Sequence, residues 1–401
     1  MLTKDELKNY APDTVQLYSG MEMQDDLNSE AAPLYLTTAF ILPNDLDGIK
    51  ECYAEKKFTY IRTRSPNRRL LEDAISALEH SEKSLIFSSG MAAIHTSLMT
   101  FLKSGDHIIA GSELYGESIE LLTHYKRFNI EVDFADFTDI EAIKKAIKPN
   151  TKIIYTETIS NPKITIVDIE SVAKVAHAAG AMLFVDNTFA TPCAINCMDK
   201  GADIVIESLT KFMNGHSDAL LGSISGKAEL VDKIEMLQHL YGGTGGTFNS
   251  WLVLRSLRTV DIRMAKHMAS ADKLANALAK NPHIVKVNYP TVPGYPQAKL
   301  AKKLFDGEGF GAMFSFELKP EDQKELSAIL KNLKLAQYAP TLGGFRTTLS
   351  HPCTSSHSEL TEEERLAIGI HQGMMRVSVG LENPNDLISD FTQAIDKAFA
   401  K

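Results

Sequence analysis

Short apolar runs alternate with amphipathic stretches between residues 84 and 207. The runs predict β-strands, and the stretches between most of them have helical spacing, for example 140–147 and 169–179. Strands that alternate with helices are typical of a largely parallel sheet covered on both faces. The predicted strands are 84–87, 107–110, 130–134, 153–156, Met182–Asp186 and Ile204–Glu207.

The alternation breaks near 241–247, and a smaller α+β unit is expected after it. A long helical pattern covers 250–279, a Pro-rich turn region covers 289–296, and strands are predicted at 313–318 and 375–379. Helices are predicted at 70–78, 91–102 and 321–330, with a closing helix from Asp386. The first sixty residues lack a rhythm and predict an extended arm with a short helix.

Composition and charge exclude several classes of protein. The 401 residues are 44% hydrophobic and 23% charged, which argues against disorder, collagen and coiled coils. The net charge of -9 argues against general attraction to nucleic acid or anionic membranes. No apolar run approaches the ~20 residues of a membrane span. Residues 1–10 carry charges where a signal peptide needs an apolar core, so we expect a cytoplasmic protein.

The four cysteines predict neither a disulfide framework nor a metal site. Cys52, Cys193, Cys197 and Cys353 contain no CxxC pair and no zinc-ligand spacing. We expect four reduced thiols and no bound metal.

Two small-residue segments are candidates for anion binding. Ser88-Ser89-Gly90 lies between a predicted strand and a predicted helix, where backbone N–H groups approach an anion. A turn of this kind also needs glycine for steric reasons alone. The segment 307–312 resembles a dinucleotide fingerprint, but a strand rather than a helix is predicted after it. We therefore interpret it as a turn and exclude a nicotinamide cofactor.

An acid and a lysine follow neighbouring predicted strands. Asp186 ends one strand, and Lys211 lies just beyond the next, 25 residues later. In an open α/β sheet, functional groups collect at the carboxyl ends of the strands. From the pair alone, two interpretations are equally favoured: a functional site, or a simple ion pair at the rim of the sheet.

The surroundings of Lys211 favour the functional interpretation. Ser208 and Thr210 place hydroxyls suited to a phosphate beside it, and His216-Ser217-Asp218 follows. A desolvated lysine loses its proton and forms a Schiff base with an aldehyde. A carboxylate such as that of Asp186 holds a pyridinium nitrogen protonated. Together these groups predict pyridoxal 5'-phosphate (PLP) as the cofactor.

The sequence resembles the PLP enzymes of cysteine and methionine metabolism, which have the aspartate-aminotransferase-like fold (PLP fold type I). The resemblance runs from about residue 32 to residue 387, with its motifs in the family's order. The motifs are Tyr60-Ile61-Arg62, 87–91 (FSSGM), Leu114-Tyr115-Gly116, 157–162 (ETISNP), 185–189 (VDNTF), 208–218 (SLTKFMNGHSD), Leu342-Gly343-Gly344, His351-Pro352 and 376–382 (RVSVGLE).

The resemblance implies roles at the cofactor ring. Lys211 is implied to form the Schiff base and, once released, to move protons between substrate carbons. Asp186 is implied to pair with the ring nitrogen, and Asn161 to hydrogen-bond the ring hydroxyl and contact the substrate. Tyr115 is implied to stack on the ring and to assist proton transfer at the leaving group. Thr188 is implied to be a further cofactor contact.

The resemblance also implies a phosphate site and a substrate site. The backbone N–H groups of Gly90 and Met91 and the hydroxyls of Ser208 and Thr210 are implied to hold the phosphate. Arg376 is implied to bind the substrate carboxylate as a bidentate fork, and Thr341 lies on the substrate wall. An arginine at an ordinary surface position fits poorly within the apolar run MMRVSV.

Tyr60 and Arg62 are implied to reach the phosphate of a neighbouring subunit. The expected assembly is a homotetramer, a dimer of dimers whose active sites are shared between subunits. The expected division of the chain is an N-terminal arm over 1–60 that contacts the neighbouring subunit, a PLP-binding domain over 61–255 and a C-terminal domain over 256–401.

Several positions depart from the family's pattern. Ser65-Pro66-Asn67 replaces Asn-Pro-Thr, Thr341 follows Pro340 in the substrate wall, and Arg346 stands where an acid is common. Glu117 stands where the family often has Gly, or Cys in methionine γ-lyases. A carboxylate there favours a substrate with a cationic tail, as in cystathionine or canavanine. Glu117 turning away to pair with a basic residue is the equally weighted alternative.

The resemblance predicts a PLP-dependent lyase that cleaves a γ-substituted amino acid to a 2-oxo acid and ammonia. Two alternatives use the same site: γ-replacement, as in a cystathionine γ-synthase or O-acylhomoserine sulfhydrylase, and β-elimination, as in a cystathionine β-lyase. A non-enzymatic regulator derived from the fold is a further alternative. It needs an added partner or DNA-binding module, for which no stretch remains. The expected partner is a small amino-acid substrate.

Overall fold

A seven-stranded sheet forms the centre of the larger part of the chain in a computed structural model that describes residues 4–21, 27, 29–305, 307, 309–319, 322–358 and 360–400. The strand order is β1-β7-β6-β5-β4-β2-β3, and only β7 runs antiparallel to its neighbours. The prediction of a largely parallel sheet is confirmed. The strands are β1 (Lys83–Phe87), β2 (His107–Gly111), β3 (Glu131–Ala135), β4 (Thr151–Glu157), β5 (Met182–Asp186), β6 (Ile204–Glu207) and β7 (Gly222–Gly226).

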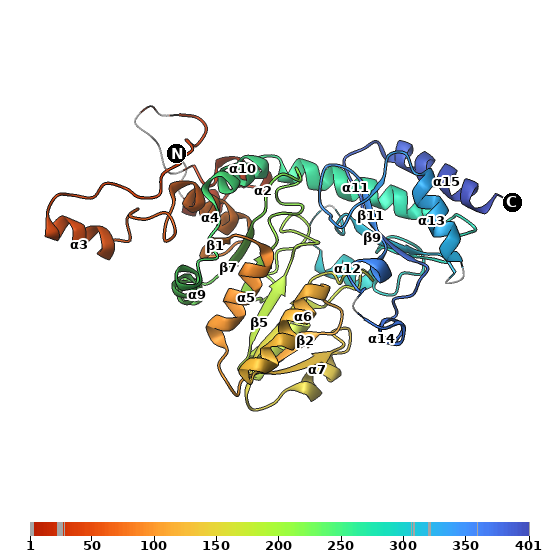
Figure 1. The fold of residues 1–401 in the computed structure, drawn as a ribbon, viewed down its shortest axis with the longest axis horizontal. Helices are drawn as coiled ribbons and strands as arrows, with labels where there is room; N and C mark the ends of the chain where they lie inside the picture. Colours follow the sequence, from red (N-terminus) through yellow and green to blue (C-terminus); the bar gives the residue numbers. More distant parts are fainter. Residues whose placement is uncertain are drawn as a thin grey trace.

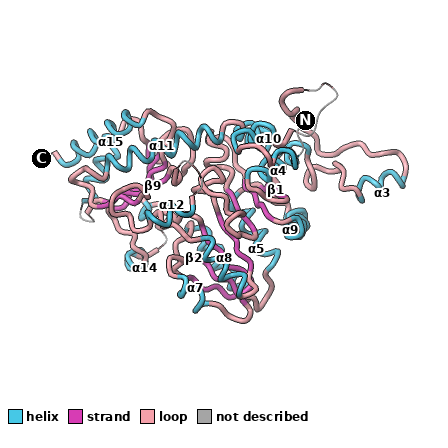
Figure 2. Tube along the Cα trace, turned by 180° about the vertical axis from the view of Figure 1, so that it is seen from behind, coloured by secondary structure: helices cyan, strands magenta, loops and turns pink. Residues whose placement is uncertain are grey.

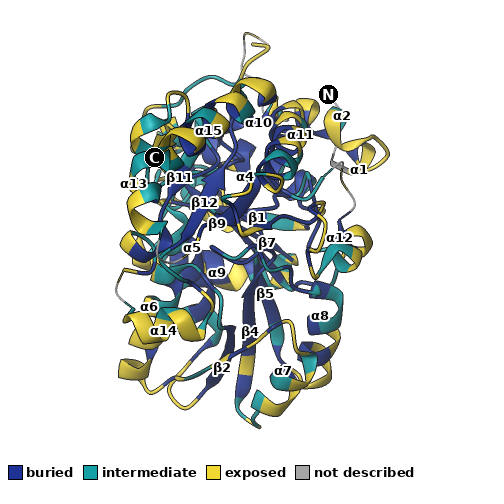
Figure 3. Cartoon of the chain, turned by 90° about the vertical axis from the view of Figure 1, so that its right-hand side faces the viewer, coloured by how far each residue is buried: buried dark blue, intermediate teal, exposed yellow. Residues whose placement is uncertain are grey.

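Helices cover both faces of this sheet, as the buried strands between exposed helices in Figure 3 show. Successive side chains of each strand enter opposite cores because the strand repeat is two residues: Ile204 and Ile206 pack in one core and Val205 in the other. One core contains residues of α5 (Gly90–Phe101), α6 (Gly116–His124), η1 (Tyr125–Phe128) and α9 (Ala228–Tyr241). The other contains residues of α4 (Pro66–Leu78), α7 (Ile140–Ala146), α8 (Ile169–Ala178), α10 (Thr247–Leu257) and α12 (Ala298–Leu304).

A five-stranded sheet forms the second unit, which lies toward the C-terminus in Figures 1 and 2. Its order is β10-β11-β12-β9-β8, antiparallel except between β10 and β11. The strands are β8 (Lys286–Asn288), β9 (Met313–Glu317), β10 (Gln337–Tyr338), β11 (Thr348–Ser350) and β12 (Met374–Ser378). The helices of this unit are α13 (Gln323–Asn332), η3 (Pro352–Thr354), α14 (Glu362–Ala367) and α15 (Pro384–Phe399).

Helix α11 (Val260–Leu278) joins the two units. Its first half packs in the core of the large sheet through Val260 and Met264, and its second half in the core of the small sheet through Leu274 and Leu278. The prediction of a single helix over 250–279 is wrong, because the helical structure is interrupted between α10 and α11. The carbonyl of Ser256 accepts the backbone N–H of Thr259 at 3.3 Å and a guanidinium nitrogen of Arg263 in α11 at 3.1 Å. The apolar pattern continues across the break, since both helices feed the same core.

The first sixty residues form two different parts. Helix α2 (Pro12–Tyr18) follows α1 (Lys4–Leu7) and is bound to the end of α10 in the same chain. Arg258 donates to the carbonyls of Gln16 and Ser19 at 2.6 and 2.7 Å. The extended stretch around α3 (Leu46–Ala54) projects away from both units, on the side opposite to the C-terminus (Figures 1 and 2). The expected extended arm and short helix are therefore present.

Strand β7 and helix α9 were not predicted from the pattern. Strand β7 is fully buried but consists of Gly222, Ser223, Ile224, Ser225 and Gly226, so only one large apolar side chain marks it. The helix predicted over 321–330 begins at Gln323, and residue 321 lies outside the described residues. Among the described helices, none has the length and apolar content needed to cross a membrane.

Candidate active site

A cavity of about 480 Å³ opens at the carboxyl edge of β4, β5 and β6. The small C-terminal unit closes it from the other side. Every site residue predicted from the sequence lines this cavity except Tyr60 and Arg62. The predicted residues that line it are Gly90, Met91, Tyr115, Glu117, Asn161, Asp186, Thr188, Ser208, Thr210, Lys211, Thr341 and Arg376.

The carboxylate of Asp186 is held at the end of β5. It accepts a hydrogen bond from the backbone N–H of Thr188 at 3.0 Å, and the Thr188 hydroxyl accepts one from the backbone N–H of Ser208 at 2.8 Å. Burial raises the pKa of Asp186, and the bonds from Thr188 oppose that rise. No lysine, arginine or histidine of the described residues forms an ion pair with it, so a cation placed in the cavity would find an open partner.

Lys211 lies just beyond this edge, in the turn that follows β6. Burial lowers the pKa of its amino group, and the nearby Arg376 guanidinium lowers it further. The turn is packed closely against the second unit: a Cβ on Gly343, whose φ is +73°, would lie 2.5 Å from the backbone nitrogen of Phe212. Glycine at this point of the Leu-Gly-Gly motif therefore lets the two units meet at Lys211.

The N-terminus of α5 lies at the cavity wall beside Ser208. Ser89 caps the helix by accepting the backbone N–H of Ala92 at 3.1 Å, and the first two helical residues, Gly90 and Met91, line the cavity. A Cβ on Gly90 would lie 3.2 Å from the Ser208 hydroxyl oxygen, so this hydroxyl lies directly beside the helix start. The Thr210 hydroxyl bonds both backbone groups of Leu221 at 3.1 Å, which fixes its position.

Arg376 enters the cavity from β12 of the small sheet. It is only 6% exposed, and its Nη1 donates to Oδ1 of Asn161 at 2.9 Å. Burial lowers the pKa of this guanidinium to about 10, against the opposing influence of Tyr115 and Glu157. It forms no ion pair with a carboxylate of the described residues, so an anionic ligand would satisfy a buried cation.

Tyr115 and Glu117 lie at the start of α6. Burial raises the pKa of Tyr115 to about 12, and the Glu117 carboxylate beside it contributes to that rise. Glu117 lines the cavity, no lysine or arginine of the described residues forms an ion pair with it, and its charge acts on the Lys211 amine. A Cβ on Gly116 would lie 2.3 Å from the carbonyl oxygen of Ser356, so the loop after η3 packs tightly on this helix start.

Several residues that line the cavity were not predicted from the sequence. Glu157 ends β4 next to Asp186, and it accepts the backbone N–H of Tyr115 at 2.6 Å. An acid at the end of a predicted strand is a signal that could have identified it. Ser355 and Ser356 also line the cavity, but nothing in the local pattern distinguishes them from ordinary loop residues.

Tyr60 and Arg62 lie elsewhere, beside a second cavity of about 550 Å³ between the arm and α9. The Arg62 guanidinium carbon lies 5.7 Å from the centre of the Tyr60 ring, and the group donates to the carbonyl of His239. Within one chain these two residues are not brought to the cavity that contains Lys211.

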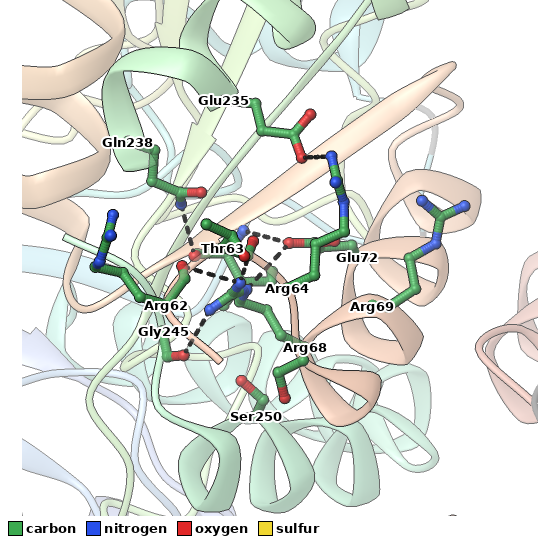
Figure 4. A network of polar contacts seen from close by, with 12 residues as sticks. Arg62, Thr63, Arg64, Arg68, Arg69, Glu72, Glu235, Gln238, Gly245 and Ser250 are labelled. Carbon is green, nitrogen blue, oxygen red and sulfur yellow. Dashed lines mark hydrogen bonds and ion pairs between the residues drawn. The ribbon is translucent and has the colours of Figure 1, made fainter. Parts of the chain in front are cut away.

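Arg68, a buried arginine that was not predicted as a site residue, holds the chain around Tyr60 and Arg62 in place (Figure 4). Arg68 donates to the carbonyl of Thr63 at 2.7 Å and to that of Ile61 at 3.2 Å. Arg64 forms an ion pair with Glu235 of α9 at 2.5 Å. These contacts hold the base of the arm on the large unit.

Residues 13–396 match the family model described as Cys/Met metabolism PLP-dependent enzyme. The chain belongs to this family. It is therefore a PLP-dependent enzyme, and the expectation drawn from its motifs is confirmed.

Individual relatives have several activities. The chain is 39% identical over 397 residues to L-methionine gamma-lyase of Fusobacterium nucleatum subsp. polymorphum, covering 98% of this chain and 100% of the relative. It is 41% identical over 340 residues to a cystathionine beta-lyase of Bacillus subtilis, covering 84% and 86%. The crystal structure of a putative O-acetylhomoserine (thiol)-lyase from Campylobacter jejuni is similar with a TM-score of 0.91 and 30% identity, covering 96% and 100%. That structure contains N'-pyridoxyl-lysine-5'-monophosphate.

The cavity of this family member fits PLP. The N-terminus of α5 with Ser208 suits a phosphate, and the buried carboxylate of Asp186 lacks a cation partner among the described residues. Lys211 has an amine whose lowered pKa suits reaction with an aldehyde. The anion site, the acid and the amine lie around one cavity, as a cofactor with a phosphate, a basic ring nitrogen and an aldehyde requires.

Proposed function

We propose that this enzyme is a PLP-dependent γ-lyase: it removes the γ-substituent of an amino acid such as cystathionine or methionine. The overall reaction of a thioether adds one water to the substrate and releases a thiol, 2-oxobutyrate and ammonia. The observation that carries the proposal is the position of Lys211 in one cavity with Asp186 and Arg376. The family match and the γ-lyases among the relatives support it.

When bound, PLP supplies an aldehyde and a ring that withdraws electrons from the substrate carbons. In the proposed mechanism the Arg376 guanidinium binds the substrate α-carboxylate, and Asn161 orients that guanidinium through its 2.9 Å hydrogen bond. The lowered pKa of Lys211 makes its amine available as the base that removes the Cα proton and then a Cβ proton.

Two further residues complete the proposed mechanism. The carboxylate of Asp186 would keep the ring nitrogen cationic, because the pair satisfies a buried charge. The raised pKa of Tyr115 keeps its phenol protonated at neutral pH, so it would donate a proton to the departing sulfur. The phosphate would lie on the N–H groups of Gly90 and Met91 and the hydroxyl of Ser208. Thr188, Thr210 and Thr341 would contact the ligands from the cavity wall.

The product of a substrate panel tests the reaction. The purified holoenzyme is incubated separately with cystathionine, methionine, homocysteine and O-acetylhomoserine, and the keto acid and ammonia are measured. We expect 2-oxobutyrate from at least one of them. Pyruvate from cystathionine would instead show β-elimination, and a new thioether formed from O-acetylhomoserine and a thiol would show γ-replacement. These two reactions are the competing functions, because a cystathionine beta-lyase and a cystathionine gamma-synthase/O-acetylhomoserine (thiol)-lyase are among the relatives of this chain.

We also propose an assembly and a domain division. The arm over 1–60 would contact a neighbouring subunit, the PLP-binding domain would cover 61–255 and the C-terminal domain 256–401. Large apolar side chains on the arm are exposed in the single chain, namely Leu36, Ile41, Leu46 and Tyr53, and a partner subunit would cover them. The expected state is a homotetramer whose sites are shared, in which Tyr60 and Arg62 of each chain serve the partner. A cytoplasmic location fits the four free cysteines.

Complementation tests the shared site. A Tyr60→Ala/Arg62→Ala chain and a Lys211→Ala chain are each expected to be inactive. When the two are co-expressed, half of random dimers are mixed, and each mixed dimer has one intact site. Activity should therefore return to about one quarter of the wild-type value. A co-expressed pool that stays inactive would contradict sharing between subunits.

A further inference from the structure

Glu117 places a carboxylate without an ion-pair partner on the wall of the active-site cavity. It lies in the first turn of α6 and is exposed to the cavity rather than covered by protein. Its electrostatic neighbours are the Tyr115 hydroxyl and the Lys211 amine. No lysine or arginine of the described part of the chain forms an ion pair with it.

The cavity therefore carries opposite charges at two places. Arg376 supplies a cation, which suits the α-carboxylate of an amino acid, and Glu117 supplies an anion. The loop residues Ser355 and Ser356 add hydroxyls on the wall near Glu117, because the carbonyl of Ser356 packs against Gly116. At this point of the wall a purely apolar tail would cover the Glu117 carboxylate without pairing it, whereas a cationic tail would gain a charge-assisted contact.

On the basis of the proposed γ-lyase function, we propose that Glu117 selects substrates whose γ-substituent ends in a cation, such as an ammonium or a guanidinium group. Arg376 holds the α-carboxylate, and the tail beyond the γ-heteroatom lies against Glu117. Arg346 is exposed and does not line the cavity. Three carboxylates line the described cavity: Glu157 accepts the backbone N–H of Tyr115, Asp186 accepts that of Thr188, and Glu117 is left for a cationic tail.

The test uses two substrates of equal size that differ in tail charge. S-(2-aminoethyl)-L-homocysteine ends in an ammonium group, and S-propyl-L-homocysteine ends in a methyl group. Both release 2-oxobutyrate, so one assay gives kcat/KM for each. The wild-type holoenzyme should prefer the aminoethyl substrate by about 10- to 100-fold, the range expected for one hydrogen bond to a charged group.

Two variants assign the preference to one side chain. Because the Glu117 carboxylate also acts on the Tyr115 hydroxyl, the readout is the ratio of kcat/KM for the two substrates, which Glu117→Gln should bring to about one. Glu120→Gln, an exposed acid on the same helix that does not line the cavity, should leave the preference unchanged. A wild-type enzyme that treats both substrates alike, or a Glu117→Gln variant that keeps the preference, would overturn the inference.

The result is separable from the proposed reaction. If neither substrate yields 2-oxobutyrate, the γ-lyase function fails, and binding of the two amino acids to the holoenzyme is then measured by titration of its visible absorbance. Tighter binding of the aminoethyl compound that Glu117→Gln abolishes would still support selection by charge. Equal binding of the two would refute it.

Discussion

Strands β5 and β6 lie side by side and each ends in an acid, yet the two acids lie in opposite environments. Asp186 of β5 faces the cavity and accepts a hydrogen bond from the Thr188 backbone. Glu207 of β6 lies on the other face of the sheet, where it meets Glu79 at the end of α4. Glu207 is 1% exposed and Glu79 is 0% exposed, and no donor of the described residues reaches their carboxylate oxygens.

Burial favours the protonated forms of the two carboxyl groups behind the sheet. Burial raises the pKa of Glu79 to about 8 and that of Glu207 well above its ordinary value, and the negative charge of Glu79 raises the pKa of Glu207 further. Asp186, with donors from Thr188 and space for a cation, has its pKa raised by burial alone. An acid at a strand end can therefore meet a ligand where a cavity opens beside it, as at Asp186, whereas one enclosed by the core, as at Glu207, is held neutral and affects stability.

The largest expected effect is a loss of activity from a substitution on the cavity side of the sheet. Lys211→Ala removes the only lysine that lines the described cavity wall, so 2-oxo acid formation should fall by more than about 10³-fold. Lys163→Ala is the matched control: Lys163 pairs with Glu113 at 2.5 Å and does not line the cavity. The variant's initial rate and circular dichroism are compared with the wild type. A rate above a tenth of the wild-type value would contradict the role assigned to Lys211.

The second-largest loss of activity is expected at Arg376, the buried arginine that enters the same cavity from β12. Arg376→Lys keeps the charge but loses the planar fork that binds a carboxylate and the hydrogen bond to Asn161. We expect KM to rise about 10- to 100-fold, with a smaller change in kcat. Steady-state kinetics over a wide substrate range measure both constants. An unchanged KM would mean that the α-carboxylate binds elsewhere.

The third effect lies behind the sheet and concerns stability. In the unfolded chain Glu79 loses its proton near the ordinary glutamate pKa of 4.5, whereas in the folded chain it keeps it up to about 8. The folded state therefore binds more protons in this window, and stability falls as the pH rises through it. Burial holds Glu207 protonated in the same way, so Glu207→Gln, which mimics the protonated acid, should remove the share of Glu207 in this dependence and raise the stability at pH 8 by about 1–3 kcal/mol.

Urea unfolding between pH 5 and pH 8 measures this effect. Glu229→Gln, an exposed acid on α9, should leave the slope of stability against pH as in the wild type. A Glu207→Gln protein whose stability falls with pH as steeply as the wild type would show that the pair is not the source. The activity should change little, since Glu207 does not line the cavity.

Much of the site was predictable because its parts are local in sequence. Apolar runs mark β5 and β6, and the carboxyl ends of parallel strands meet at one edge, so Asp186 and Lys211 were expected together. The motif at Ser89-Gly90 predicted a helix start facing an anion, because small residues at that turn are required by backbone geometry.

Other features depended on contacts between distant segments. At the break between α10 and α11, the carbonyl of Ser256 accepts hydrogen bonds from the Thr259 backbone and from the Arg263 guanidinium, while the apolar pattern continues on both sides of the break. Strand β7 is recognised only in place, because Ser223 and Ser225 are buried by neighbours that the local sequence does not reveal.

The sequence by itself determined the family, the cofactor and the acid and amine at the sheet edge, because these depend on residue type and short-range order. Only the tertiary structure decided that Arg376 bonds Asn161, that Glu117 faces the cavity without a basic ion-pair partner in the described residues, and that Glu207 meets Glu79. Each of these joins segments far apart in the chain. Whether a charge is paired, open to a ligand or neutralised depends on what folding brings beside it.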